Sequence, residues 1–139
     1  MYYLKTEDSF DSAHFLKGYE GKCSNIHGHR WKVVVEVGGE TLETTGPKRG
    51  MVVDFCDIKD ALHKLCDELD HSLIMEEGSL KPKTLEALLD EGFRINEFKF
   101  VPTAENFARY FYEEIKKMGF EAQRVEVYET PSNIAIYEG

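Results

Sequence analysis

The sequence predicts an α+β protein with two strands first, two helices next and two strands at the end. Three observations support this order: stretches rich in β-branched residues near both ends, two stretches with apolar residues at helical spacing between them, and turns rich in Gly or Pro. The 139 residues are 42% apolar and contain no repeat, linker or change of composition. We therefore expect one domain spanning residues 1–139, with its own core.

The first two strands are expected to lie in the first quarter of the chain. One covers roughly Tyr2 to His14, and the other runs from about His29 to Gly38. Turns are predicted at Gly38-Gly39 and in the Gly- and Pro-containing stretch 45–50. Met51-Val-Val53 follows as a short return strand.

Two amphipathic helices are predicted next. Asp54 is a suitable N-cap for the first, with His63 off the apolar stripe and exposed. Its stripe consists of Phe55, Ile58, Leu62, Leu65, Cys66 and Leu69. Thr103 is the expected N-cap of the second, and Gly119 its stop signal. The second stripe consists of Phe107, Phe111, Ile115 and Met118.

The chain is expected to end in an antiparallel hairpin. Its strands are Arg124 to Glu129 and Ile134 to Tyr137, joined by Thr-Pro-Ser-Asn. Between the two main helices, residues 84–91 are expected to form a short helix and residues 93–101 to be extended. An open sheet of four strands leaves unpaired edges, so we also expect an oligomer.

Charge and composition exclude several classes of protein. The net charge of −9 and the lack of a basic stripe argue against nucleic acid binding. No signal region is visible, and nothing approaches the run of about 18 apolar residues that a membrane span needs. The three cysteines show no disulfide spacing, which agrees with a reducing compartment. We expect a cytoplasmic protein without a membrane partner.

The stretch Cys23-Ser-Asn-Ile-His27-Gly-His29, with His14 upstream, predicts a metal site. Three of the five histidines lie here, and imidazole and thiolate are ligands that zinc prefers. Residues two apart on a strand face the same side, so His27 and His29 can bind one ion. The pair alone fits a simple turn, but His14 and Cys23 favour a metal.

The spacing leaves two alternatives for Cys23. It is either a fourth ligand that closes a structural site, or a reactive thiol beside a site of three histidines with one open position. Structural zinc sites usually contain two or more cysteines, whereas three histidines and an open position are typical of catalytic zinc. We favour the open site, in which the cation and imidazoles stabilise the Cys23 thiolate.

Three further acidic positions admit a structural and a functional interpretation. Asp70 and His71 follow the first helix, where a turn former and a cation are common, and they can act as a pair only if the helix stops before them. Glu105 falls in a first helical turn, where the dipole alone favours an acid. Glu129 shares strand parity with apolar residues, so a ligand explains its carboxylate.

Taken in order, these motifs resemble one family from the first strand to the last. They are Phe-x-x-x-His14, Cys23-x-x-x-His27-Gly-His29, Asp70-His71, Pro-Thr103-x-Glu105-Asn and Tyr-Glu129-Thr. This order resembles the 6-pyruvoyltetrahydropterin synthase and 6-carboxytetrahydropterin synthase family. The short gap between Cys23 and His27 is more similar to the 6-carboxy-5,6,7,8-tetrahydropterin synthases of the queuosine (7-deazaguanine) pathway.

The resemblance implies a fold and an assembly. The fold is the tunnelling fold (T-fold), a four-stranded antiparallel sheet with two helices on one face. Subunits of such proteins join into a trimeric barrel, and two barrels stack as a homohexamer with active sites at subunit junctions. The stretch from Glu77 to Phe100 is longer than the family pattern, and Ala104 stands where some relatives have Thr.

The resemblance also implies roles for the residues of the motifs. His14, His27 and His29 would bind Zn²⁺, and Cys23, Asp70 and His71 would be catalytic. Thr103, Glu105 and Glu129 would bind a pterin. The implied reaction is lyase chemistry on 7,8-dihydroneopterin triphosphate, which with one water gives 6-carboxy-5,6,7,8-tetrahydropterin, acetaldehyde and triphosphate. The alternatives are a pyruvoyl product, an aldolase-like folate-branch activity and, more distantly, a non-enzymatic zinc-stabilised assembly module.

Overall fold

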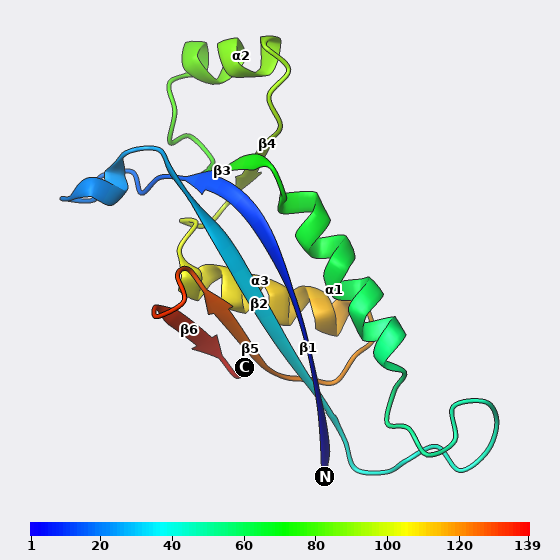
Figure 1. Cartoon of the computed structure of the whole chain (residues 1–139). Helices are drawn as coiled ribbons and strands as arrows, with labels where there is room; N and C mark the ends of the chain where they lie inside the picture. Colours follow the sequence, from blue (N-terminus) through cyan, green and yellow to red (C-terminus); the bar gives the residue numbers. More distant parts are fainter.

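The protein folds as a twisted sheet with two helices packed against one face (Figure 1). The computed structural model describes residues 1–139, and the predicted α+β class is confirmed. The elements in chain order are β1 (Tyr2–His14), η1 (Lys22–Ser24), β2 (His27–Gly39), α1 (Phe55–Leu69), β3 (Ser72–Glu76), α2 (Pro82–Asp90), β4 (Ile95–Phe98), α3 (Ala104–Lys117), β5 (Ala122–Tyr128) and β6 (Ile134–Tyr137).

The sheet contains six strands, in the order β4-β3-β1-β2-β5-β6. β1, β2, β5 and β6 form the expected antiparallel part, with β1 and β2 paired from Tyr2↔Gly39 to His14↔His27. The predicted number of four strands is wrong, because β3 pairs parallel to β1 and β4 parallel to β3. These two strands extend the sheet beside the carboxyl end of β1.

Most predicted boundaries agree with the structure to within about two residues, and one predicted strand is absent. Residues 51–53 do not form a strand, because this segment pairs with the chain only through isolated turn hydrogen bonds such as Glu43 N–H to Met51 O, at 2.9 Å. β2 begins at His27 rather than near His29, because His27 already pairs with His14. The short helix is α2, and the extended stretch after it contains β4.

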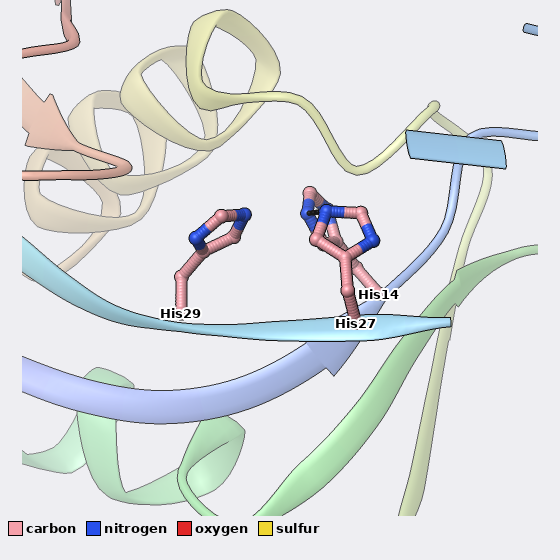
Figure 2. Close-up of side chains that lie close together, drawn as sticks. All are labelled: His14, His27 and His29. Carbon is pink, nitrogen blue, oxygen red and sulfur yellow. Dashed lines mark hydrogen bonds between the residues drawn. The ribbon is translucent and has the colours of Figure 1, made fainter. Parts of the chain in front are cut away.

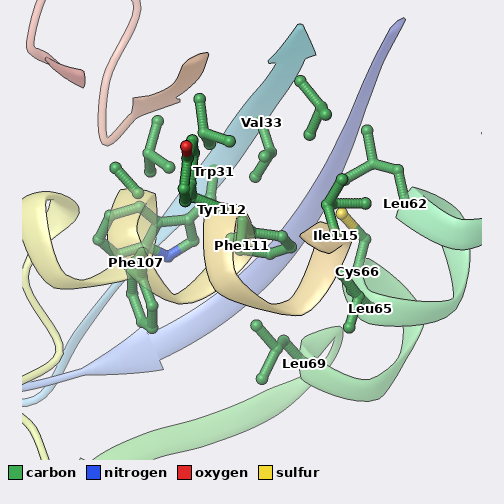
Figure 3. Packing of buried hydrophobic residues seen from close by; sticks show 14 of the residues in the cluster. Trp31, Val33, Leu62, Leu65, Cys66, Leu69, Phe107, Phe111, Tyr112 and Ile115 are labelled. Carbon is green, nitrogen blue, oxygen red and sulfur yellow. The ribbon is translucent and has the colours of Figure 1, made fainter. Parts of the chain in front are cut away.

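The core lies between the sheet and the helices α1 and α3 (Figure 3). At its centre Phe10 stacks on Trp31, with ring centroids 6.1 Å apart, and Phe107 meets Trp31 edge-on at 4.9 Å. The predicted stripe of α1 is buried from Ile58 to Leu69, whereas Phe55 at its start is exposed. This packing places the end of α1 and the start of α3 at the same end of the sheet, beside the last residues of β1.

The other face of the sheet carries charged side chains rather than a second helical layer. Lys5 lies 3.7 Å from Glu36 and 3.4 Å from Glu126, and Arg30 forms a bidentate pair with Asp11. α2 has no buried residue and stands apart from the helical layer in Figure 1. No helix has the length and apolar character needed to cross a membrane.

Candidate metal centre and active site

Three histidines converge at the end of the β1–β2 pair (Figure 2). His14 is the last residue of β1 and His27, its direct cross-strand partner, is the first residue of β2. His29 follows two residues later, so its ring projects from the same face of the sheet. One possible ligand atom from each imidazole lies within 4.8 Å of the other two. The structure thus brings together the three residues that the spacing predicts.

Backbone carbonyls fix the tautomers of two of these rings. Nδ1 of His14 lies 2.7 Å from the carbonyl oxygen of Pro102, and Nδ1 of His27 lies 2.7 Å from that of Asn25. A carbonyl can only accept, so both Nδ1 atoms carry the hydrogen, and in the neutral form of each ring the Nε2 atom carries a lone pair. These two Nε2 atoms are 3.0 Å apart. Two lone pairs at this distance repel unless a cation lies between them.

The third ring also presents an unpaired nitrogen. Nε2 of His29 is buried without a hydrogen-bond partner. It lies 3.5 Å from Oε1 of Glu129, which is an ion-pair distance but too long for a good hydrogen bond. A buried polar atom without a partner is costly, and a metal ion would satisfy it.

Burial favours the neutral form of His14 and His29, which is the form that binds a metal. Burial lowers the pKa of His14 to about 4, and the neighbouring His27 and His29 add to the effect against the hydrogen bond to Pro102. Burial also lowers the pKa of His29, although Glu129 opposes the shift. Tetrahedral zinc, with Zn–N bonds of about 2.0–2.1 Å, would hold its ligand nitrogens about 3.3 Å apart. The donor set of three imidazoles suits zinc, and the 3.0 Å between Nε2 of His14 and Nε2 of His27 is close to this separation.

Cys23 lies near the histidines in sequence but outside their cluster. It sits half-buried in η1, on the connection between β1 and β2, where its carbonyl oxygen accepts from Leu16 N–H at 2.9 Å. The group of mutually close ligand atoms contains no cysteine sulfur. This geometry favours three imidazoles and an open position over a closed site with a thiolate.

The helix α1 stops directly before Asp70 and His71, as a working pair requires. Asp70 is extended, with φ −66° and ψ 139°, and His71 has a left-handed φ of 53°. Their side chains meet, with Oδ2 of Asp70 2.8 Å from Nδ1 of His71. The other carboxylate oxygen accepts from Asp11 N–H at 2.8 Å. This backbone bond and the His71 ring hold the pKa of Asp70 below its usual value, so it is a carboxylate at neutral pH.

His71 opens toward solvent, and its side chain is 79% exposed. It lines a cavity of about 760 Å³ together with residues of β1, β2 and β4, among them Arg30 on β2, and with Arg94 directly before β4. No hydrogen bond or ion pair joins Asp70 or His71 to Cys23 or to the three histidines. Within one chain, the structure therefore does not bring the dyad and the thiol into direct contact.

The three remaining site residues lie at the ends of α3 and β5. Glu129 follows β5 directly, and its carboxylate faces His29, as its strand parity predicts. Thr103 is the N-cap of α3, and its Oγ1 accepts from Asn106 N–H at 3.3 Å. Glu105 lies exposed in the first turn of the same helix and has no hydrogen-bond partner. Of these three residues, Glu129 is the one with a side-chain contact to a histidine of the cluster.

A comparison with known families identifies the chain. The model of the family described as 6-pyruvoyl tetrahydropterin synthase matches residues 3–139. The chain belongs to this family. It is therefore a lyase-type enzyme of the 6-pyruvoyl tetrahydropterin synthase family, as its motifs predict.

Relatives within the family agree in sequence and in fold. The chain is 35% identical to the 6-carboxy-5,6,7,8-tetrahydropterin synthase of Haemophilus influenzae, over 99% of both chains. It is 36% identical to the enzyme of that name from Synechocystis, over 80% of this chain and 94% of the relative. The 6-pyruvoyl tetrahydropterin synthase of Caenorhabditis elegans superposes with a TM-score of 0.70, at 29% identity, covering 99% of this chain and 95% of that one.

A further solved structure confirms the fold alone. An uncharacterized protein from Wolinella succinogenes superposes with a TM-score of 0.81, at 23% identity, over 99% of this chain and 98% of that one. The tunnelling fold expected for the 6-pyruvoyl tetrahydropterin synthase family is therefore confirmed, with six strands in this chain rather than four.

Several groups at this site carry no signal in the sequence. The carbonyls of Pro102 and Asn25, which fix the imidazole tautomers, act through backbone atoms that any residue would supply. Asp11 supports the dyad through its main-chain N–H. The cavity beside His71 is lined by residues from segments far apart in sequence, Arg30 and Arg94 among them. Only tertiary structure places these groups.

Proposed function

We propose that this protein is a zinc-dependent lyase that converts 7,8-dihydroneopterin triphosphate and water to 6-carboxy-5,6,7,8-tetrahydropterin, acetaldehyde and triphosphate in queuosine biosynthesis. The observation that carries the proposal is the pair of Nε2 lone pairs on His14 and His27, 3.0 Å apart beside the unpaired nitrogen of His29. The carboxy product is supported by the 35% identical Haemophilus influenzae relative, whose name specifies it.

In the proposed site, His14, His27 and His29 hold the zinc ion. The ion supplies Lewis acidity toward the side-chain hydroxyls of the substrate. The chain holds the ligands rigidly, because the rings of His14 and His27 are hydrogen-bonded to backbone carbonyls and His14 is only 1% exposed. Ligands held in this way keep their orientation when substrate enters.

Glu129 is proposed to orient the pterin ring beside the metal. A carboxylate can accept two hydrogen bonds from the amino-pyrimidinone edge of a pterin, as it does from a guanidinium. The Glu129 carboxylate is partly exposed and lies beside His29, so a ring bound to it would place its side chain near the cation. Thr103 and Glu105, at the start of α3, are proposed to bind the same ring.

Cys23, Asp70 and His71 are proposed to move protons during the reaction. The Asp70 carboxylate accepts from Nδ1–H of His71, which leaves the exposed Nε2 of that ring free to take or give a proton. The Cys23 thiol is proposed as the partner base. Internal proton shifts of this kind reduce the ring at the expense of the side chain, so no redox cofactor is needed.

We also propose that residues 1–139 act as one domain within a cytoplasmic homohexamer, a dimer of trimers. The sheet supports this proposal because it ends in two short strands, β4 and β6, whose outer edges pair with nothing within the chain. β6 carries Ile134 and Ile136, both more than 40% exposed. Pairing of such edges between subunits would cover them. It would also allow residues from neighbouring chains to complete one site.

Product analysis by mass spectrometry tests the proposed reaction. Zinc-loaded protein incubated with 7,8-dihydroneopterin triphosphate should give a carboxypterin and acetaldehyde. A pyruvoyl product, or an aldolase-type cleavage product, would overturn the carboxy assignment while leaving lyase chemistry in place. No turnover with zinc fully bound would favour a non-enzymatic assembly module.

The variant Cys23→Ala separates the enzyme from such a module. The proposal expects zinc at the wild-type stoichiometry and a loss of turnover, because the thiol is outside the ligand set. Cys23→Ser is the matched variant of nearly the same size. Loss of zinc from both variants would show that the sulfur is a ligand.

A further inference from the structure

The end of α1 is held by side chains from β3, from β4 and from the residue directly before β4. The last carbonyls of a helix lack partners within the helix and need other donors. Asn96 on β4 donates from Nδ2 to the carbonyl of Glu68, at 3.1 Å, and Arg94 donates from Nη1 to that of Asp70, also at 3.1 Å. Between them, Ser72 donates from Oγ to the carbonyl of Leu69, at 2.6 Å. Three successive carbonyls are therefore satisfied from outside the helix.

The amide of Asn96 ties this arrangement together. Its Nδ2 donates to Oγ of Ser72, at 2.9 Å, in addition to Glu68. Because the Ser72 hydroxyl gives its hydrogen to Leu69, its oxygen is free to accept. Ser72 is 7% exposed, so loss of the Asn96 amide would leave its buried hydroxyl oxygen without a hydrogen-bond donor. Asn96 therefore bridges α1 and β3.

The turn held by these contacts is the one that presents His71. The left-handed φ of His71 is one that glycine adopts readily and other residues adopt at a cost. On the other side, β1 holds the same turn, with His71 N–H donating to the Asp11 carbonyl at 2.7 Å and Asp11 N–H donating to the Asp70 carboxylate at 2.8 Å. A strained conformation persists only when its surroundings fix it.

We propose that Asn96 on β4 and Arg94, the residue directly before β4, are positioning residues that hold Asp70 and His71 in their catalytic geometry. The proposal rests on the catalytic role of His71 proposed above. It gives a function to part of the stretch 77–100, which exceeds the family pattern and which the site residues do not use. Asn96 does not line the cavity beside His71, so it reaches the reaction only through the turn. Arg94 also lines that cavity, which makes Asn96 the cleaner test.

Asn96→Asp and Asn96→Leu test the proposal. Both keep the approximate shape of the side chain and remove its two N–H donors. Glu97→Gln is the matched control, since Glu97 is the next residue of β4, exposed and without a hydrogen-bond partner. We expect kcat to fall about 10- to 100-fold in both Asn96 variants, as displacement of a catalytic group by about 1 Å does. KM should stay within about twofold, with zinc content and the control unchanged.

A double-mutant cycle shows whether Asn96 acts through His71. In the His71→Ala background, Asn96→Leu should reduce the residual kcat no further, because the group it positions is gone. An NMR titration of the His71 ring supplies an independent readout. In Asn96→Leu the ring should lose its bond to Asp70, seen as a changed Nδ1–H signal, whereas Glu97→Gln should keep the wild-type signal.

The outcomes separate this proposal from the proposed function. If His71→Ala abolishes turnover but folded Asn96 variants keep the wild-type kcat and ring signal, the positioning role is wrong and the function stands. If His71→Ala keeps full turnover, the catalytic role of His71 fails and the positioning role fails with it. If the Asn96 variants do not fold, Arg94→Met decides by the ring signal, and Arg94→Lys should restore it.

Discussion

Replacing His71 by glycine should separate stability from catalysis. His71 lies in the left-handed region, with φ 53°. It follows Asp70, which is the residue directly after the end of α1. This conformation costs a residue with a side chain about 1–2 kcal/mol, and glycine pays none of it. Glycine gains freedom in the unfolded chain, worth about 0.5–1 kcal/mol in the opposite direction. The ring itself is 79% exposed, so its contact with Asp70 adds little.

These contributions predict a result for each of two variants. The free energy of unfolding of His71→Gly should be within about 1 kcal/mol of the wild-type value, because the two conformational effects oppose each other. His71→Ala keeps the strain and should be less stable than His71→Gly by about 1 kcal/mol, a difference of about 4 °C in Tm for a domain of this size. Both should lose turnover and keep zinc.

Urea unfolding of the zinc-loaded variants, run beside turnover and metal analysis, measures all three quantities. A His71→Gly protein destabilised by more than about 2 kcal/mol would show that the ring is a structural group. A His71→Gly protein less stable than His71→Ala would refute the strain argument itself.

Three further changes have defined outcomes. His14→Ala should lose zinc. Free zinc at about 100 times Kd stabilises the wild type by about 2.7 kcal/mol, and the variant should lack this gain. An unchanged Tm shift on adding zinc would contradict the ligand assignment. Glu129→Gln should keep zinc and lose substrate affinity, measured as a raised KM. The amide has only one oxygen, so it cannot accept the two parallel hydrogen bonds that a carboxylate receives from the pterin edge. An unchanged KM would exclude that contact. His63 is hydrogen-bonded to Asp8 at 2.9 Å, and that bond and the carboxylate charge raise its pKa. Its contribution to stability should therefore be complete below pH 6.5 and vanish as pH rises through the folded pKa. NMR titration should find a lower His63 pKa in Asp8→Asn, and an equal value in both proteins would show that the pair does not form in solution.

The sequence predicts the parts of the fold that follow a regular period. The apolar stripes and the N-caps Asp54 and Thr103 predict α1 and α3. The structure confirms both caps. The five-residue strand β3 was missed, since it follows α1 after two residues and shows no alternation. It becomes a strand by pairing with residues 12–14, far away in the chain. Short parallel strands depend on such distant partners.

The candidate site divides in the same way. The spacing of His27 and His29 shows that both rings share a face, and the parity of Glu129 shows that it joins them. The tautomer of His14 depends instead on the carbonyl of Pro102, which is 88 residues away. The stop of α1 before Asp70 depends on donors from β3, from β4 and from Arg94 directly before β4. Local sequence carries no record of either contact.

X-ray absorption spectroscopy of the zinc-loaded protein tests the metal centre most directly. We predict nitrogen and oxygen scatterers alone at about 2.0–2.1 Å, with imidazole features from three histidines and a light atom in the remaining position. A sulfur scatterer at about 2.3 Å would place Cys23 in the coordination shell and contradict the open catalytic site.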